Sequence, residues 1–483
     1  ASNNTAVGYQ AGYSNTTGTD LVAIGHNSLQ NNLTGSQNTA VGRIAMQNNT
    51  YGTNNAALGY QSLYSNTTGS NNVAFGNQAL VSNTTASYNT AVGYQAGYSN
   101  STGDLLTAVG RLALYSNTTG TQNSAVGQSA LYSNTTGNYN NAFGSGALQS
   151  NSTGANNTAI GQQALYLNTT ASNNTAIGYQ AGYSNTTATY NTFIGYKAGY
   201  PSTGVGITAI GGNVLSSNTS GTNNTGLGGT DGVVFGAALE SNTTGSYNTA
   251  VGNGALLANT TGSYNTAHGA LALKSNTTAS NNTAVGYGAG YTNQTGGNIT
   301  AFGFQALYSN TASNNTAVGY LAMNNNTSGT DNVGMGTLVM NSNTTGSSNV
   351  AIGRQALQAN TTASNNTAVG YQAGYSNTTG AGFTGLGYKA GYSGSTASYN
   401  TAIGFQALQT ATGQYNGAVG GFCLQSLTTG NNNNAFGLNA GYSLTTGINN
   451  TFIGDASGYS VTTGSKNTII GAYSGNNGGL DIR

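Results

Sequence analysis

The stretch Asn-Thr-Ala-Val-Gly-Tyr-Gln-Ala-Gly-Tyr-Ser-Asn, residues 4–15, decides the fold because it returns throughout the chain. It recurs at residues 89–100 and, with Ile in place of Val, at residues 174–185. Aligned on its central glycine, the motif runs from Gly8 to Gly471 with a spacing of 17 residues in 23 of 27 intervals, 16 in three and 24 in one. Self-similarity at a fixed period is typical of repeat architectures, so we expect one array of about 28 coils.

The composition excludes several classes of protein. The 483 residues carry 8 Lys+Arg and 7 Asp+Glu, or 3% charged residues, where a globular domain has about 25%. So little charge offers nothing to attract nucleic acid or an anionic membrane. With 32 tyrosines and 1 proline the chain also lacks the composition of a disordered segment. One cysteine excludes an internal disulfide framework, and no apolar run is long enough to insert into a membrane.

Each coil is numbered here from its corner glycine as position 0. Positions −4 to −1 read Asn-Thr-Ala-(Val/Ile/Phe), +1 to +5 read Tyr-Gln-Ala-(Leu/Gly)-Tyr, and +6 to +10 read Ser-Asn-Thr-Thr-(Gly/Ala). We expect two strands of about four or five residues, separated by a glycine corner and closed by a polar turn. Stacked coils then pair as parallel strands about 4.8 Å apart. The predicted fold is an all-β parallel β-solenoid, or β-roll.

The distribution of charge predicts which positions are buried. Outside the irregular segment 229–252, no charged residue occupies −3, −2, −1, +3 or +4, so we expect these positions to be buried. Apolar ladders at −1 and +4 form the expected core, and +3 is almost always Ala or Ser. Because one coil buries little apolar surface, we expect several chains to associate along the alanine ladders. The predicted assembly is a homotrimeric rod of roughly 130 Å.

The array divides into four segments. Residues 1–228 and 253–475 are regular coils, and residues 229–252 form an irregular coil or bulge around a second anchor, Val233–Gly236. We expect residues 476–483 to be an exit segment toward a missing C-terminal domain.

The motif Asn38-Thr39-Ala40-Val41-Gly42, with Ala45, resembles the head repeats of trimeric autotransporter adhesins. The resemblance covers nearly the whole chain and implies left-handed parallel β-rolls wound into trimers. Coils of 17 residues are longer than in that family's best-known heads, and position −3 is usually Thr where the family has Val. Long runs of such coils also resemble tail-fibre proteins of marine bacteriophages. Those arrays commonly end in a segment like residues 474–483, ahead of a self-cleaving chaperone domain.

We expect no catalytic residue, no cofactor site and no metal site. The titratable groups are scattered over the coils, so the repeat brings no acid–base pair together. The acids are too few to give each coil a calcium ligand, and the glycines lack the context of a phosphate-binding loop. Cys423 occupies the small +3 ladder, where we expect an unreactive buried thiol. The protein is therefore not expected to be an enzyme.

Two ladders remain as candidate sites. Tyrosines at +1 and +5 either contact sugars or a partner, or cover the space left by Gly at +4. The candidates are Tyr9, Tyr13, Tyr60, Tyr64, Tyr94, Tyr98, Tyr179 and Tyr183. Asn at +7 either forms a ladder of side-chain amide hydrogen bonds or, as an Asn-x-Thr sequon, carries glycans on an exposed turn. These residues are Asn15, Asn66, Asn83, Asn117 and Asn134.

Toward the C-terminus, position +7 becomes Ala411, Leu427, Leu444 and Val461, and from this apolar turn we expect a contact with a following domain or a neighbouring chain. The predicted function is the repetitive shaft of a phage tail fibre or a cell-surface adhesin. Such an extracellular fibrous protein gives reach and multivalent attachment. Its partners are copies of itself and a glycan or protein receptor on a host cell. The alternative is a subunit of an extracellular filament that stacks end to end.

Overall fold

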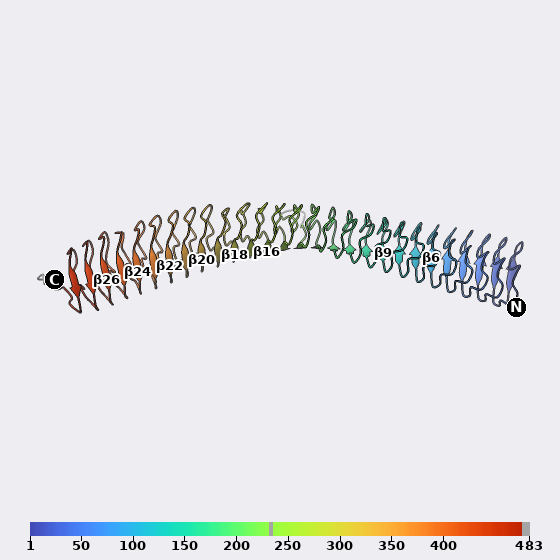
Figure 1. Cartoon of the computed structure of the whole chain (residues 1–483), viewed down its shortest axis with the longest axis horizontal. Helices are drawn as coiled ribbons and strands as arrows, with labels where there is room; N and C mark the ends of the chain where they lie inside the picture. Colours follow the sequence, from blue (N-terminus) through green and yellow to red (C-terminus); the bar gives the residue numbers. More distant parts are fainter. Residues whose placement is uncertain (231–234, 476–483) are drawn as a thin grey trace. The chain divides into compact units, whose positions relative to one another are not determined.

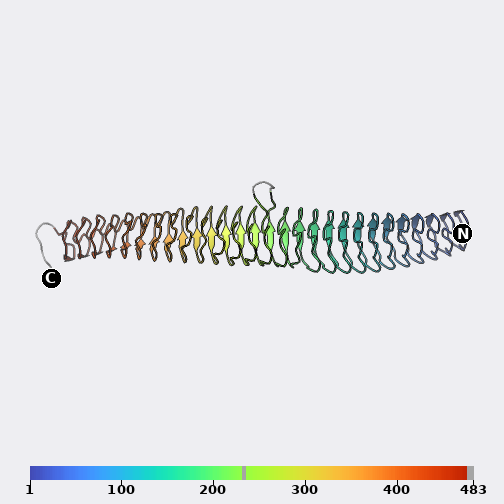
Figure 2. The same ribbon diagram turned by 90° about the horizontal axis from the view of Figure 1, so that it is seen from above.

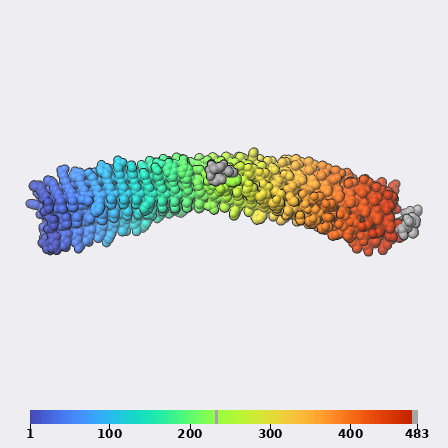
Figure 3. Space-filling model, turned by 180° about the vertical axis from the view of Figure 1, so that it is seen from behind, coloured from blue at the N-terminus to red at the C-terminus, as the bar shows by residue number. Residues whose placement is uncertain are grey.

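A computed structural model describes residues 1–230 and 235–475 of the chain. It is an all-β parallel β-solenoid, and the contacts divide it into two units, Ala1–Tyr247 and Asn248–Arg483. Within each unit the coils lie side by side, each contributing one short strand to a continuous sheet (Figures 1 and 2). The space-filling view shows neighbouring coils in close contact along each unit (Figure 3). The predicted fold class, an all-β parallel β-solenoid, is therefore confirmed.

Every strand is three residues long and occupies positions −3 to −1. In the first unit the strands are β1 Thr5–Val7, β2 Val22–Ile24, β3 Thr39–Val41, β4 Ala56–Leu58, β5 Val73–Phe75, β6 Thr90–Val92, β7 Thr107–Val109, β8 Ser124–Val126, β9 Asn141–Phe143, β10 Thr158–Ile160, β11 Thr175–Ile177, β12 Thr192–Ile194, β13 Thr208–Ile210 and β14 Thr225–Leu227. In the second unit they are β15 Thr249–Val251, β16 Thr266–His268, β17 Thr283–Val285, β18 Thr300–Phe302, β19 Thr316–Val318, β20 Val333–Met335, β21 Val350–Ile352, β22 Thr367–Val369, β23 Thr384–Leu386, β24 Thr401–Ile403, β25 Gly417–Val419, β26 Asn434–Phe436, β27 Thr451–Ile453 and β28 Thr468–Ile470.

Neighbouring strands are parallel and in register with the repeat. Thr158 pairs with Thr175, and the same offset of one coil is kept by Ala159 with Ala176. Identical residues therefore stack on one another along each unit.

The strand has one inward and two outward side chains, which corrects the predicted burial. Ala at −2 is inside, as at Ala159 with an exposed fraction of 0%, whereas Ile160 at −1 is 42% exposed. Side chains alternate between the two faces of a strand, so −3 and −1 share the outer face once −2 points inward. The −1 ladder is thus not part of the core. The absence of charge from a position did not mean that the position is buried.

The second predicted strand, +1 to +5, is instead a run of turns. Positions +2 and +4 adopt the left-handed region, as in Gln61 with φ 57° and Leu63 with φ 52°. Backbone N–H groups of alternate residues in this run donate hydrogen bonds to the next coil and to the preceding coil. Leu63 N donates to Ala79 O of the next coil at 2.9 Å, and Gln61 N donates to Arg43 O of the preceding coil at 3.3 Å. These bonds offset a conformation that non-glycine residues rarely adopt.

The corner glycine is required by both its backbone and its neighbour. Gly110 has φ 133°, a region that only glycine adopts readily, and an added Cβ would lie 2.5 Å from Gly127 O in the next coil. The same pair of constraints recurs at most corner glycines, as at Gly42 and Gly353, which explains why the repeat is anchored on glycine.

The interior contains small apolar residues together with two rows of asparagine. Ala at −2 and +3, Leu or Met at +4, and Asn at −4 and +7 are buried in most coils. The alanine ladders therefore lie inside each coil, where a second chain cannot reach them. The predicted contact between chains along these alanines is wrong, because their side chains are already enclosed by their own coil.

Irregular coils keep this interior in register. In the 16-residue coil that starts at Gly195, Ser202 replaces the asparagine at +7, and Asn218 Nδ2 donates to its Oγ at 2.9 Å. The 24-residue interval contains an insertion, after which Ala238 N donates to Gly228 O at 2.9 Å and Asn242 Nδ2 donates to Asn218 Oδ1 at 2.8 Å. Of the predicted features, Val233 and Val234 and the exit segment 476–483 lie outside the described residues.

Candidate binding surfaces

The asparagines at +7 form the predicted ladder of amide hydrogen bonds. Asn134 Nδ2 donates to Asn117 Oδ1 at 2.8 Å, and Asn117 Nδ2 donates to Asn100 Oδ1 at 2.9 Å. Each Nδ2 also closes the turn, as in Asn134 to Gly137 O at 3.0 Å. Both amide hydrogens are therefore used inside the protein, which lets a polar side chain be buried at low cost.

A second asparagine ladder at −4 was not predicted. Asn157 N donates to Asn140 Oδ1 at 3.1 Å, and Asn157 Nδ2 donates to Ala171 O at 2.8 Å. The signal was available, because −4 lies on the same side of an extended strand as the inward alanine at −2. The two ladders together hold the turn and the strand of successive coils at fixed spacing.

The candidate sequon residues are placed unfavourably for glycosylation of the folded chain. Asn66, Asn83, Asn117 and Asn134 are fully buried, and Asn15 in the first coil is half-buried. Their Nδ2 atoms, which a glycan would have to substitute, donate hydrogen bonds to the coil; Asn83 donates to Asn66 at 3.0 Å and Asn15 to Gly18 O at 3.0 Å. The expectation that +7 lies on an exposed turn is therefore wrong, because this side chain turns inward.

The same geometry changes the interpretation of the apolar residues at +7. Leu427 and Leu444 are buried inside their coils, with exposed fractions of 0%. They substitute for asparagine in the interior and are not an external contact with another domain or chain.

The predicted tyrosines at +1 lie on the surface. Tyr9, Tyr60, Tyr94 and Tyr179 are all exposed. Several ring faces are covered by the residue at +1 in the next or preceding coil: His26 stacks on Tyr9 at 5.2 Å, Tyr196 stacks on Tyr179 at 5.6 Å, and the Arg43 guanidinium lies 5.7 Å from the Tyr60 ring centre. A covered face cannot stack on a sugar ring, so Tyr9, Tyr60 and Tyr179 each have one ring face already occupied by a neighbouring coil.

The predicted tyrosines at +5 are mostly half-buried and form stacks. Tyr64, Tyr98 and Tyr183 are half-buried, while Tyr13 in the first coil is exposed. Tyr98 stacks on Tyr115 with ring centres 5.0 Å apart, and Tyr183 stacks on Tyr166 and Tyr200 at 5.1 Å each. The eight tyrosines therefore belong to two separate ladders.

The space at Gly +4 is filled from inside. A Cβ on Gly97 would lie 2.9 Å from Leu80 Cδ2, the side chain at +4 of the preceding coil. The tyrosine at +5 is not what occupies this space.

The outer face of the sheet is a surface that the sequence analysis missed. Positions −3 and −1 point outward from every strand, and −1 is apolar in all coils of the first unit. Leu58, Phe143 and Leu227 expose 49%, 44% and 43% of their surface. No Lys, Arg, Asp or Glu occupies −3 or −1 in any coil. The result is a continuous apolar stripe flanked by a row of mostly threonine hydroxyls. A shallow groove of about 200 Å³ lies on the same face of the second unit, lined by Val419, Phe436 and Ile453.

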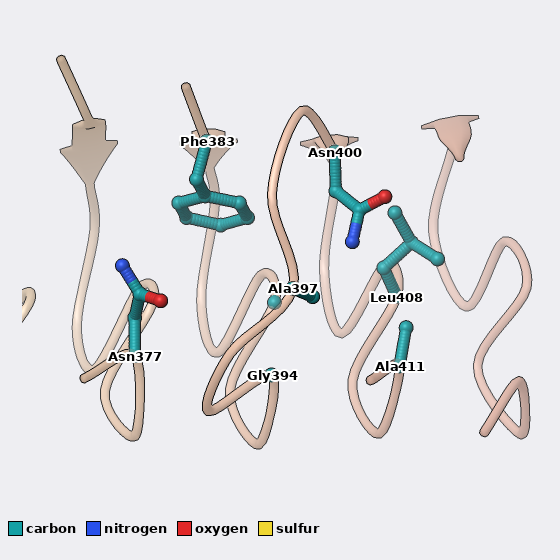
Figure 4. A pocket seen from close by; sticks show the side chains of 8 residues that line it. Asn377, Phe383, Gly394, Ala397, Asn400, Leu408 and Ala411 are labelled. Carbon is teal, nitrogen blue, oxygen red and sulfur yellow. The ribbon is translucent and has the colours of Figure 1, made fainter. Parts of the chain in front are cut away.

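An interior cavity in the second unit is too small for an organic ligand. It measures about 10 Å³ and lies where Gly394 and Ala411 interrupt the asparagine row at +7 (Figure 4). Phe383, Asn377 and Asn400 are among the side chains that line it. A volume of this size holds about one water molecule, whereas ligand pockets measure several hundred Å³.

The remaining reactive groups do not form a site. Burial raises the pKa of Cys423 to about 12, and its Sγ donates to Ala435 O at 3.2 Å. The expectation of a buried thiol is confirmed. Among residues 1–230 and 235–475, no three His, Cys, Asp or Glu side chains come together as a bound metal ion would require. In the part of the chain that the structure describes, no helix is long and apolar enough to cross a bilayer.

Neither the scan against protein-family models nor the search of curated proteins finds a match to this chain. The resemblance to adhesin heads and phage tail fibres therefore stays a prediction.

Proposed function

We propose that this chain is the repetitive shaft of an extracellular fibre, of the kind found in a phage tail fibre or a cell-surface adhesin. The observation that carries the proposal is the uniform interior. In most coils the same buried positions hold alanine, leucine and hydrogen-bonded asparagine. Backbone hydrogen bonds join neighbouring coils in the strand and in the turns. Such a stack depends only on contacts between neighbouring coils, so it gives length without a globular core.

The surface supports a mechanical and multivalent role. Each exposed feature is repeated once per coil, and the outward positions carry few charges. A receptor that binds one coil weakly would meet many equivalent positions, which raises the overall avidity. A glycan or protein on a host cell is the class of receptor that this role requires.

We further propose that copies of the chain associate side by side through the outer sheet face. Fourteen strands of the first unit carry an apolar residue at −1. Together these side chains present on the order of 1,000 Å² of apolar surface, which is the size of a stable specific interface. Soluble monomers rarely leave an apolar stripe of that extent in water. A homotrimer places three such faces together and covers them all.

The mass of the purified chain in solution, measured by light scattering together with negative-stain imaging, tests this proposal. Discrete particles of about three chains support the shaft. A monomer at micromolar concentration contradicts the side-by-side association. Open-ended filaments contradict a discrete shaft and support the end-to-end polymer instead.

A further inference from the structure

Tyrosines at +5 are stacked face to face in several runs of coils, and two of these runs extend over three coils each. In the first run Tyr98, Tyr115 and Tyr132 have ring centres 5.0 and 5.1 Å apart, with interplanar angles of 13° and 5°. In the second run Tyr166, Tyr183 and Tyr200 have both spacings at 5.1 Å, with angles of 4° and 16°. Each ring therefore lies almost parallel to the same ring of the next coil.

We propose that these stacked tyrosines are sites of oxidative coupling, in which a carbon–carbon bond between two rings joins successive coils. The co-reactant is a one-electron oxidant. Each phenol loses one electron and its hydroxyl proton to become a tyrosyl radical. Two radicals then bond through the ring carbons ortho to oxygen, and the hydrogens on those carbons move to the oxygens to restore both phenols. Two tyrosines thus give one dityrosine, two protons and two electrons, and the oxidant takes up the electrons.

The geometry favours coupling between neighbours in the stack. Because the stacked rings are nearly parallel with centres 5.0 to 5.1 Å apart, each ring presents its face to the ring of the next coil. The backbone beside the rings is fixed, since Ser99 N donates to Tyr115 O at 2.9 Å and Ser116 N donates to Tyr132 O at 3.0 Å. The ring torsion of tyrosine is soft, so two rings can tilt toward each other without moving the backbone. A radical formed on one ring therefore meets its neighbour before it meets another molecule.

The protonation state of the middle rings is compatible with this chemistry. Burial and the two flanking phenols raise the pKa of Tyr115 above its ordinary value, and the same causes raise that of Tyr183. Both groups remain neutral phenols at neutral pH. These side chains are half-buried, so part of each ring remains open to solvent for release of the proton.

The coupling would reinforce the solenoid. Coils are held to each other only by non-covalent bonds between neighbours, so an array can open between any two of them. A dityrosine bond across two coils closes a loop within the chain and opposes that opening, in the way a disulfide does. Chain oxidised in the folded state is therefore expected to unfold at a higher denaturant concentration than untreated chain.

The test uses the folded chain, with tris(bipyridine)ruthenium(II) as photosensitiser and persulfate as the electron acceptor. Dityrosine is detected by its fluorescence, and the coupled residues are located by mass spectrometry after digestion. In the two three-coil runs the expected products are four intramolecular links between residues 17 apart: Tyr98 with Tyr115, Tyr115 with Tyr132, Tyr166 with Tyr183, and Tyr183 with Tyr200.

Two variants sharpen the result. Tyr115→Phe keeps an aromatic ring in the stack but removes the reacting phenol, so both links of the first run should disappear while the links of the second run are unchanged. Tyr64→Phe is the matched control, because the residues at +5 on either side of it are Gln47 and Val81, and it should remove none of the four links. The proposal is overturned if the links form mainly at exposed tyrosines outside the stacks, such as Tyr88 and Tyr139, or if chain unfolded in denaturant gives the same four links in the same yield.

Discussion

The ring of Phe193 occupies the space beside Gly182 in which most other coils place a leucine. A Cβ on Gly182 would lie 2.5 Å from Phe193 Cδ2, and the ring also lies against Gly199 in the following coil. The same exchange recurs in the second unit, where Phe452 at −2 lies between Gly441 and Gly458. Phenylalanine at −2 between two glycines at +4 therefore fills interior volume that most coils fill with leucine at +4 beside alanine at −2.

The packing of Phe193 predicts what happens when this site is changed to alanine at −2 and leucine at +4, the residues found in most coils. Phe193→Ala alone leaves a cavity and should cost about 3–5 kcal/mol of local stability. Adding Gly182→Leu and Gly199→Leu should recover most of that loss, because leucine at +4 adopts the same left-handed φ, as Leu63 does at 52°. Hydrogen exchange of the amides around β12 measures the effect coil by coil. A triple variant as unstable as Phe193→Ala would contradict the exchange.

The corner glycine gives a prediction with a matched control. Gly110→Ala combines a φ of 133° with a Cβ that would meet Gly127 O, and should cost about 3 kcal/mol or more. Gly212→Ala places a Cβ no closer than 3.9 Å to its nearest neighbour, Tyr196 O, and should change stability by less than about 1 kcal/mol. The comparison is made on hydrogen exchange in the mutated and adjacent coils. Equal protection in the two variants would mean that the corner tolerates a side chain.

The period, the parallel register and the asparagine ladder at +7 were predictable because identical residues at a fixed spacing must stack once the coils pair. The burial of −1 was not predicted correctly, since the argument relied on where charges are absent. The better indicator of burial was the alternation of side chains between the two faces of the strand, because the small residue at −2 identifies the inward face. Ile160 and Leu165 are both uncharged apolar residues, yet only Leu165 is buried.

The turns at +1 to +5 could not be read from local preference. Gln61 and Leu63 are residues that seldom adopt positive φ, and Tyr, Gln and Leu in sequence suggest a strand. Hydrogen bonds to the coils on both sides determine their conformation, and those bonds exist only in the stack. The inward direction of asparagine at +7 was missed for the same reason, because the turn that aims it is defined by these residues.

Cys423 should be unreactive in the folded chain and should make stability depend on pH. With a pKa of about 12, the thiol is about 10⁻⁴ ionised at pH 8, so iodoacetamide should modify it at least about 1,000-fold more slowly than in unfolded chain. The folded pKa lies above the ordinary value of 9.0, so the unfolded state loses its proton first and stability falls as the pH rises from about 9 to 12.

Tyrosine ionisation contributes in the same pH range, so the thiol is isolated by comparison with Cys423→Ala. Alanine is the usual residue at +3, as at Ala113, and this variant should keep the fold while showing a smaller loss of stability above pH 9. Identical pH profiles for the two chains would show that the thiol does not contribute.

The outer sheet face gives the most direct test of association between chains. Ile160 and Ile177 point outward with exposed fractions of 42% and 37%, so lysine at both positions should change the stability of the single chain by less than about 1 kcal/mol. In an interface, however, each lysine would be a buried and unpaired charge, which is strongly unfavourable. The double variant Ile160→Lys with Ile177→Lys should therefore shift the mass in light scattering toward one chain at concentrations where the unmodified chain associates. Tyr88→Lys with Tyr139→Lys adds the same charge at −5, where Lys466 already adopts the required φ of 59°, and should leave the mass unchanged. If the isoleucine variant keeps the mass of the unmodified chain, the apolar stripe is not the surface through which copies associate.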